Sequence, residues 1–260
     1  MRIALGVAYR GTAYRGWQSQ PDGRTVQDHL ELALSQFADE PIRTLCAGRT
    51  DAGVHGLNQV VHFDTTRDRE PFSWVRGVNR YLPADIAVQW SAQPPADFHA
   101  RNHARGRRYA YVLLESAVRP ALESGAVGWI FKPLSLEAMR DGAAQLLGEH
   151  DFSAFRAAEC QAASPIKTLR TIDIGRRGAY WRFEFEANAF LHHMVRNLMG
   201  GLLAVGQGSR SPDWLGQVLA GRDRSLAAPT FAPDGLYFIG PRYDAELGLP
   251  ERTAAMDWLP

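Results

Sequence analysis

The stretch AGRTDAGVHGLNQVVHF, residues 47–63, shows most directly how this chain folds. A largely apolar run leads into it and a second apolar run ends it, which predicts two strands, 42–47 and 58–64. Three glycines stand between the runs: Gly48, Gly53 and Gly56. Glycine lets the backbone turn tightly and lets another group approach it closely, so we expect a compact turn between two strands.

The turn carries two opposite charges, the cation Arg49 and the acid Asp51. A carboxylate on a turn between two strands points outward from a rigid base, which is where reactive groups tend to lie. The plainer interpretation is that Asp51 caps the turn, as Asp and Asn often do. Spacing alone leaves both interpretations open.

The first part of the chain, residues 1–91, alternates between strand and helix patterns. Alternating apolar residues predict strands over 2–9 and 85–90, in addition to the two strands that flank the turn. Helical patterns lie at 25–37 and 71–80. The resulting order is that of a ferredoxin-like βαββαβ unit.

Three features of these segments predict local structure. Thr25 and Asp28 have the spacing of a capping box at the start of the first helix. Phe72 is expected to point inward from the second helix, with two valines that follow it. Trp17 lies in a polar, glycine-rich loop and is expected to fold back onto the core rather than contact a ligand.

The second half of the chain repeats this order more loosely. Its patterns predict strands at 108–114 and 236–239, a hairpin over 168–186, and helices over 135–147, 189–205 and 211–221. We therefore expect an α+β protein of two ferredoxin-like units, with antiparallel sheets side by side and a basic cleft at their junction. The expected divisions are 1–100 with the Asp51 loop, 101–245 as the second unit, and a tail over 246–260.

The composition is that of an ordinary globular protein, with 45% hydrophobic and 22% charged residues. No apolar run is long enough to cross a bilayer, and Cys46 and Cys160 form no CxxC pair, so we expect a reduced, cytoplasmic protein. The net charge of +1 indicates nothing about nucleic acid by itself. Residues 43–108, however, hold ten Arg against six acids, so positive charge gathers in sequence around the Asp51 turn.

Four segments of the chain resemble the TruA family of tRNA pseudouridine synthases. GRTDAGVH followed by QVVHF resembles the catalytic motif of that family. Further matches lie at 9–27 (YRGTAYRGWQSQPDGRTVQ), 98–111 (FHARNHARGRRYAY) and 188–197 (NAFLHHMVRN). The segments follow the family's order and span nearly the whole chain, which is far more specific than one short motif.

The resemblance implies an isomerase that converts uridine to pseudouridine at positions 38–40 of the tRNA anticodon stem-loop. It also implies no cofactor, no metal, and a homodimer that holds one tRNA. The reaction replaces a C1′–N1 bond with a C1′–C5 bond, and the chain accordingly lacks a GxxxxGK[ST] loop and a dinucleotide fingerprint. Asp51 takes the place of the family's nucleophile. Whether it attacks the sugar C1′ or the pyrimidine ring is left open by the sequence.

Further site residues follow from the same resemblance. Arg196 matches an arginine that we expect to keep Asp51 ionised, although a surface cation on an amphipathic helix is the plainer interpretation. Tyr109 matches the aromatic that stacks on the target base, although the strand period there also demands a buried aromatic. Arg49 matches the residue that fills the gap left by the flipped nucleotide.

A basic and aromatic set is expected to contact the rest of the RNA: Arg69, Phe98, His99, Arg101, Arg105 and Arg107. The alternative for this set is a solvated edge strand. His192 and His193 are adjacent in sequence and lack the spacing of metal ligands, so we expect core or supporting histidines.

Two other classes of protein compete with the isomerase. A non-catalytic RNA-binding protein on ferredoxin-like units would keep its role in an Asp51→Ala variant and lose binding in Arg101→Ala and Arg107→Ala variants. A nucleotide-dependent or metal enzyme is disfavoured, because the sequence has neither a phosphate loop nor a cluster of metal ligands.

Overall fold

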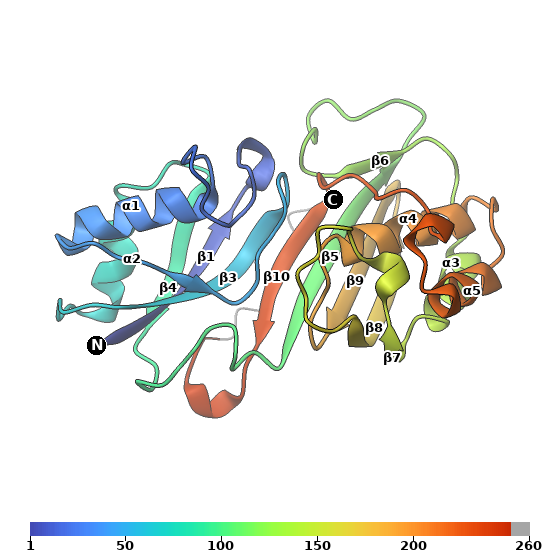
Figure 1. The fold of residues 1–260 in the computed structure, drawn as a ribbon. Helices are drawn as coiled ribbons and strands as arrows, with labels where there is room; N and C mark the ends of the chain where they lie inside the picture. The colour runs from blue at the N-terminus through green and yellow to red at the C-terminus, as the bar shows by residue number, and fades with distance from the viewer. Residues whose placement is uncertain (251–260) are drawn as a thin grey trace. The chain divides into compact units, whose positions relative to one another are not determined.

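A computed structural model describes residues 1–250 and divides them into two compact units (Figure 1). Of these residues, the first unit holds 1–106 and 237–250, and the second holds 107–236. This division differs from the expected one in two respects, because the boundary lies after Gly106 and because residues 237–250 return to the first unit. The expected tail, 246–260, lies mostly outside the described residues. The basic cleft between the two units stays a prediction.

The first unit has the expected order of strands and helices. Its elements are β1 (Arg2–Tyr9), a 3₁₀ turn η1 (Gly11–Ala13), α1 (Val26–Ala38), β2 (Leu45–Cys46), β3 (His55–Asp64), α2 (Pro71–Asn79), β4 (Ile86–Ala92), β10 (Leu236–Arg242) and a 3₁₀ turn η4 (Ala245–Leu247). The strands pair in the order β4-β1-β3, and both β2 and β10 pair with β3. β2 is shorter than the expected 42–47, while β3 begins earlier than expected, at His55.

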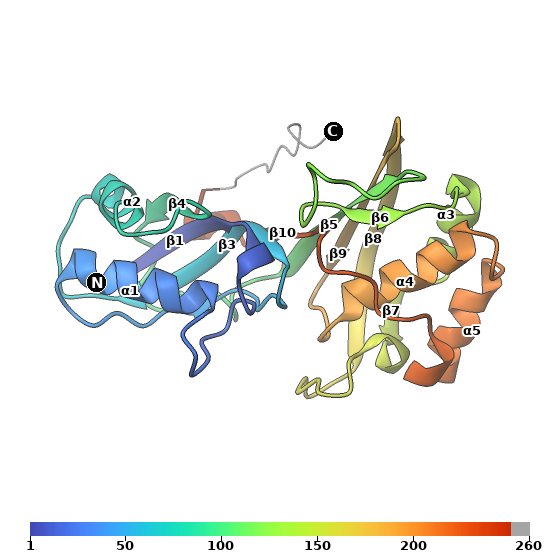
Figure 2. The ribbon, with the colours of Figure 1, turned by 90° about the horizontal axis from the view of Figure 1, so that it is seen from above.

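Both helices of the first unit pack on one face of its sheet. Leu30 of α1 and Trp74 of α2 belong to one buried cluster with Leu5 of β1 and Phe63 of β3. α1 and α2 accordingly lie together beside β1 and β3 in both ribbon views (Figures 1 and 2). Burial of these apolar faces supplies the main stabilisation of the layer.

Two of the three local expectations are confirmed. Thr25 and Asp28 form the capping box, with side chain and backbone bonded in both directions. Trp17 is only 1% exposed and lies in the core. The expectation for Phe72 is wrong, because its side chain is 66% exposed. The helix begins at Pro71, and its buried stripe falls on Trp74 and Val78, one turn apart.

The opposite face of the first sheet is covered by irregular chain. Ala4 of β1 and Val60 of β3 pack there against Phe98 and Ala100, with Tyr243 beside them. These segments contain part of the expected RNA-binding set, so the fold places that set over the face that carries no helix.

The second unit builds its sheet from β5, β9, β8 and β7, in that order, with β6 alongside β5. Its elements are β5 (Gly106–Glu115), β6 (Gly128–Ile130), α3 (Leu136–Ala144), β7 (Gly148–Asp151), η2 (Ser153–Phe155), β8 (Ile166–Arg177), β9 (Tyr180–Ala187), α4 (Met194–Gly206), α5 (Asp213–Gly221) and η3 (Arg224–Leu226). α3, α4 and α5 lie together beside this sheet (Figure 2).

The second unit differs from expectation in two short strands and in the start of one helix. β6 and β7 were not predicted, because each has too few residues for an alternating pattern to show. α4 begins at Met194 rather than at 189, because His193 has a left-handed backbone with φ of 61° and so precedes the helix. Among the helices of residues 1–250, none is long and apolar enough to span a membrane.

Candidate active site

Asp51 lies on the turn that joins β2 to β3. Its side chain is half-buried, whereas Arg49 is exposed. The Val54 N–H donates to the Asp51 carbonyl at 3.2 Å and closes the turn. Gly53 has φ of 81°, a left-handed conformation that disfavours residues with a side chain. The local sequence therefore forms a tight turn that presents one acid.

The two ends of the turn are tied together by a buried amide. The Gln59 side chain has no exposed surface and makes two hydrogen bonds with Gly48. In one, the Gly48 N–H donates to Gln59 Oε1 at 3.3 Å, and in the other the Gln59 Nε2 group donates to the Gly48 carbonyl. The Ala47 N–H donates to the Val60 carbonyl at 2.8 Å. The turn therefore projects from a rigid stem.

The loop that follows β1 packs directly on the Asp51 turn. The Trp17 N–H donates to the Thr50 carbonyl at 3.0 Å, and the Gly11 N–H donates to His55 Nδ1 at 3.1 Å. A Cβ added to Gly16 would lie 2.7 Å from the Thr50 carbonyl oxygen, and one added to Gly11 would lie 2.0 Å from the Val54 carbonyl oxygen. Only glycine allows this approach, which gives the 9–27 segment a physical role beside the catalytic motif.

β10 supports the turn from the point where β3 begins. Tyr237 pairs with His55 in parallel register, and the two rings stack with centroids 4.6 Å apart. Burial raises the pKa of the Tyr237 hydroxyl to about 12, so it stays neutral. This contact explains why the last strand belongs with the first unit.

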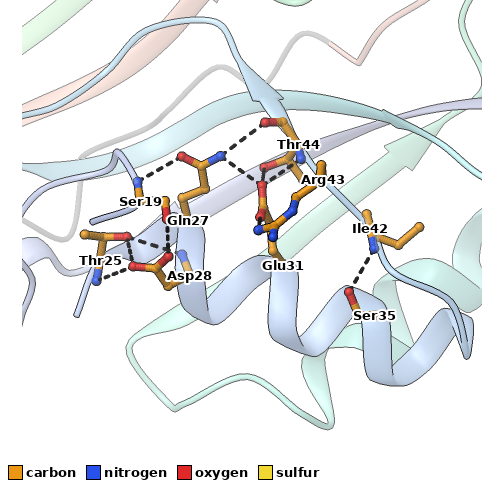
Figure 3. A network of polar contacts seen from close by, with 9 residues as sticks. All are labelled: Ser19, Thr25, Gln27, Asp28, Glu31, Ser35, Ile42, Arg43 and Thr44. Atoms are coloured by element: carbon orange, nitrogen blue, oxygen red, sulfur yellow. Dashed lines mark hydrogen bonds and ion pairs between the residues drawn. The ribbon is translucent and has the colours of Figure 1, made fainter. Parts of the chain in front are cut away.

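A buried carboxylate fixes the chain that leads into the turn (Figure 3). Glu31 of α1 accepts hydrogen bonds from the Thr44 N–H at 2.8 Å, from the Thr44 hydroxyl at 3.0 Å and from Gln27 Nε2 at 2.8 Å. Arg43 forms an ion pair with it at 2.8 Å. Thr44 immediately precedes β2, so α1 determines where the strand before Asp51 begins.

The 98–105 loop is anchored by Phe98. Its ring has no exposed surface and lies edge-to-face with His62, at 5.8 Å, and with Tyr243, at 5.4 Å. The Arg2 guanidinium donates to the Phe98 carbonyl at 2.8 Å. The structure therefore places Phe98 under the loop, where it supports its neighbours and offers no surface to a base.

His99, Arg101 and Arg105 lie on the outer side of this loop. His99 is half-buried, and its Nδ1 accepts the N–H groups of Arg101 and Asn102 at 3.2 and 3.3 Å. Arg101 is exposed, with Nη2 3.8 Å from the Cys46 sulfur at the end of β2. Arg105 is exposed and pairs with Asp244 at 2.8 Å. The two arginines thus lie within the first unit that carries Asp51.

His62 is hydrogen-bonded to the same loop. It is buried, and its Nδ1 accepts the Ala100 N–H at 3.2 Å. Burial, with the neighbouring charge of Arg2, lowers the pKa of His62 to about 4. A protonated imidazole has no acceptor nitrogen, so this loop requires the neutral ring.

Arg69 lies away from this group of residues, at the end of α1. Its guanidinium stacks over the Phe37 ring at 4.5 Å and donates to the Phe37 carbonyl at 3.2 Å. A cation near the last carbonyl groups of a helix is electrostatically favourable. The structure thus gives Arg69 a local partner on α1.

In the second unit, Tyr109 and Arg107 lie on β5. Tyr109 is 8% exposed, stands opposite Phe185 of β9, and meets Phe190 edge-to-face at 5.1 Å. The Arg107 guanidinium donates to the Asn188 carbonyl at 3.0 Å. Both contacts connect β5 to the chain that follows β9.

Arg196 lies half-buried on α4, where its stem is held by the 228–231 segment. Its Nε donates to the Phe231 carbonyl at 2.8 Å, and the Phe231 N–H donates to the Arg196 carbonyl at 3.2 Å. The buried Asn197 accepts the Thr230 hydroxyl at 2.6 Å. A Cβ on Gly200 would lie 2.2 Å from the Pro229 carbonyl oxygen. Gly200 therefore lets the 228–231 segment lie against the helix.

The two adjacent histidines before α4 differ in exposure. His193 is half-buried, whereas His192 is exposed, so His192 is not a core residue and its supporting role stays a prediction. Their ring centroids are 4.0 Å apart. The left-handed His193 turns the chain just before the helix and so directs the two rings differently from a continuous helix.

The sequence did not single out Gly11, Gly16, Gln59 or Asn197 as residues that shape the site. The first two lie in the 9–27 segment, and Asn197 ends the 188–197 segment, so the motifs contained them. Their roles depend on contacts with residues distant in sequence, which no local pattern reveals.

Comparison with known proteins identifies the family. A family model described as tRNA pseudouridine synthase matches residues 6–101 and 143–244. The protein named tRNA pseudouridine synthase A of Methylibium petroleiphilum is 75% identical over 260 residues, covering 100% of both chains. Proteins of the same name from Polaromonas naphthalenivorans and Paracidovorax citrulli are 65% and 62% identical, each again covering 100% of both chains. These matches confirm the resemblance, and the chain belongs to the tRNA pseudouridine synthase A (TruA) family.

Proposed function

We propose that this protein isomerises uridine to pseudouridine at positions 38–40 of the tRNA anticodon stem-loop, with Asp51 as the nucleophile. Membership of the family makes it an isomerase of tRNA uridines. The choice of Asp51 and of the anticodon arm goes further, and rests on the position of Asp51 in the motif and on the construction of its turn.

The observation that carries the proposal is the bracing of the Asp51 turn. Residues on both sides of the acid are tied down, before it at Thr50 by Trp17 and after it at His55 by Gly11. A turn whose only task was to connect two strands needs no such set of contacts. A nucleophile held in a fixed direction avoids the entropy cost of finding its target, which is a large part of enzymatic rate enhancement.

The reaction needs only groups that a protein supplies. The C1′–N1 bond breaks, the detached uracil turns, and a C1′–C5 bond forms, while C5 loses a proton and N1 gains one. No electron is gained or lost overall, so we propose that the enzyme works without a cofactor or metal. The carboxylate supplies the covalent step and must be ionised to do so.

Three further residues complete the proposed chemistry. We assign to Arg196 the task of pairing with the Asp51 carboxylate, supported by the fixed stem of its side chain at the Phe231 carbonyl. Tyr109 is assigned to the target base, supported by a ring that Phe190 holds edge-to-face. Arg49 is exposed beside the acid and is assigned to the gap left by the flipped nucleotide.

Three arginines, the exposed Arg101 and Arg105 and the half-buried Arg107, are proposed to contact the phosphates of the anticodon arm. Arg101 and Arg105 lie on the loop that Phe98 anchors, and Arg107 follows on β5. We place Arg69 and His99 at the margin of this surface, with Phe98 acting only as the anchor. Contacts of this kind read backbone shape, which suits an enzyme that serves three neighbouring positions.

We propose that each unit is a variant of the ferredoxin-like fold and that the protein works as a homodimer in the cytoplasm. The βαββαβ order of the first unit, with both helices on one face, supports the first part. The resemblance to the family supports the second. Sedimentation analysis of the protein with and without tRNA tests the dimer.

The proposal is tested by measuring pseudouridine in anticodon arms treated with Asp51→Asn. The substitution keeps the shape and removes the nucleophile, so we expect activity to fall by a factor on the order of 10³ or more. Asp68→Asn is a matched control, because Asp68 is an exposed acid of the same unit. Activity that survives in Asp51→Asn removes Asp51 as the nucleophile. Arg101→Ala is expected to weaken tRNA binding while the bound complex still reacts.

A further inference from the structure

One buried tyrosine touches both ends of the Asp51 turn. Tyr9 is the last residue of β1 and lies opposite Gly56 in the antiparallel register with β3. Its ring lies on Gly56 so closely that an added Cβ would come within 2.4 Å of it. Its hydroxyl lies 2.8 Å from the Thr50 hydroxyl. The same side chain thus contacts the residue just before Asp51 and the chain just after the turn.

Thr50 is held by its carbonyl and by its hydroxyl. Its carbonyl accepts the Trp17 N–H at 3.0 Å, and its hydroxyl is hydrogen-bonded to Tyr9. The residue is buried, so neither group can exchange its partner for water without opening the turn. Because Thr50 is joined to Asp51 by a peptide bond, its orientation determines the direction in which the Asp51 side chain leaves the backbone.

The Tyr9 hydroxyl is suited to a static role. The residue is 5% exposed and so does not reach substrate. Burial raises the pKa of the hydroxyl well above its ordinary value, so it stays protonated at any pH at which the protein works. A group that stays neutral and buried takes no part in proton transfer, but it forms a stable hydrogen bond.

We propose that Tyr9 is a positioning residue, which sets the direction of the Asp51 carboxylate through its hydrogen bond to Thr50. The inference rests on the proposed function, in which Asp51 is the nucleophile. Loss of the Tyr9 hydroxyl leaves the ring in place and releases the Thr50 side chain, and with it a contact of the hydroxyl with the Gln59 side chain. A misplacement of about 1 Å at a reacting group costs on the order of 10²-fold in rate, so a smaller shift is expected to lower kcat by about tenfold.

The test compares Tyr9→Phe, Thr50→Val, their combination, and Thr50→Ser. The first two remove one hydroxyl each and keep the shape of the side chain, whereas Thr50→Ser keeps the hydroxyl. Tyr14→Phe is the matched control, because Tyr14 is another buried tyrosine of this segment whose hydroxyl bonds to Asp85, at 2.5 Å, rather than to the turn. Single-turnover rates, KM for an anticodon-arm RNA, and thermal midpoints are measured for each protein.

We expect Tyr9→Phe and Thr50→Val each to lower kcat about tenfold with KM within about twofold of the wild type. The double variant is expected to lose no more than either single variant, since both remove the same bond. Thr50→Ser is expected to restore most of kcat, and Tyr14→Phe to lower only the thermal midpoint.

An unchanged kcat in Tyr9→Phe, or losses that multiply in the double variant, would overturn the inference. An equal loss of kcat in Tyr14→Phe would also overturn it, because the effect would then be general destabilisation. Failure of the positioning role can be told apart from failure of the proposed function. An inactive Asp51→Asn with a fully active Tyr9→Phe rejects only the positioning role, whereas an active Asp51→Asn rejects the nucleophile itself.

Discussion

Replacing Gly16 by alanine tests the contact between the 10–17 loop and the Asp51 turn. Gly16 has φ of 84°, and its added Cβ would lie 2.7 Å from the Thr50 carbonyl oxygen and 3.1 Å from the Asp51 carbonyl carbon. Ordinary contact begins at 3.4 Å, so one of the two segments must move by about 0.7 Å. The left-handed backbone alone costs alanine about 1–2 kcal/mol.

Gly23 separates these two effects. It lies beyond the 10–17 loop but still in the connection between β1 and α1, with φ of 67°, and a Cβ added there meets nothing within 4 Å. Gly23→Ala therefore carries the backbone strain without the contact, and is expected to lower the free energy of unfolding by about 1–2 kcal/mol with kcat unchanged. Gly16→Ala is expected to cost about 1–3 kcal/mol more, the usual cost of overpacking.

The assay pairs urea unfolding with single-turnover formation of pseudouridine in an anticodon-arm RNA. A displacement of the turn by several tenths of an ångström is expected to lower kcat of Gly16→Ala by about tenfold, a part of the roughly 10²-fold loss that a 1 Å displacement causes. Equal kcat values for Gly16→Ala and Gly23→Ala would refute the reasoning, because they would show that contact with the loop does not hold the nucleophile.

Two further predictions concern buried groups near the site. The pKa of His62 is lowered to about 4 from an ordinary 6.5, so the unfolded chain binds more protons between these values. The contribution of neutral His62 to the free energy of unfolding is therefore fully present above about pH 6.5, and it falls by up to about 3 kcal/mol as the pH drops to about 4. His62→Gln keeps an acceptor for the Ala100 N–H and is expected to flatten this pH dependence in urea unfolding. Glu31→Gln places an amide donor among the donors that surround the buried carboxylate, and it is expected to lower the free energy of unfolding by about 1–3 kcal/mol. A variant as stable as the wild type in thermal unfolding would show that the network does not hold the chain before β2.

The sequence predicted those elements whose signals are local. The capping box of α1 is an example, because Thr25 and Asp28 lie three residues apart and need no distant partner. The strand before the turn shows the opposite case. The apolar pattern suggested a strand from residue 42, but the Ile42 and Thr44 N–H groups bond to Ser35 and Glu31 of α1. Those bonds occupy the backbone that a longer strand would use, and they join residues that no local pattern connects.

The sequence likewise predicted only those parts of the site whose signals are local. The motif located Asp51, because the glycines around it indicate a tight turn from the local sequence alone. Phe98 was assigned to the RNA from its place among arginines, whereas its ring is buried by His62 and Tyr243 from remote parts of the chain. β10 likewise joins the first unit through pairing with β3 across most of the sequence. Long-range pairing of this kind becomes visible only in the folded chain.

The central claim is tested most directly with an anticodon-arm RNA that carries 5-fluorouridine at position 39. Fluorine at C5 replaces the proton that must leave, so the reaction is expected to stall with RNA attached to the enzyme. We expect an adduct whose mass and peptide map place the RNA on Asp51, within residues 47–55, and no adduct with Asp51→Asn. An adduct mapped to any other residue, or one that Asp51→Asn forms as fast as the wild type, would contradict it.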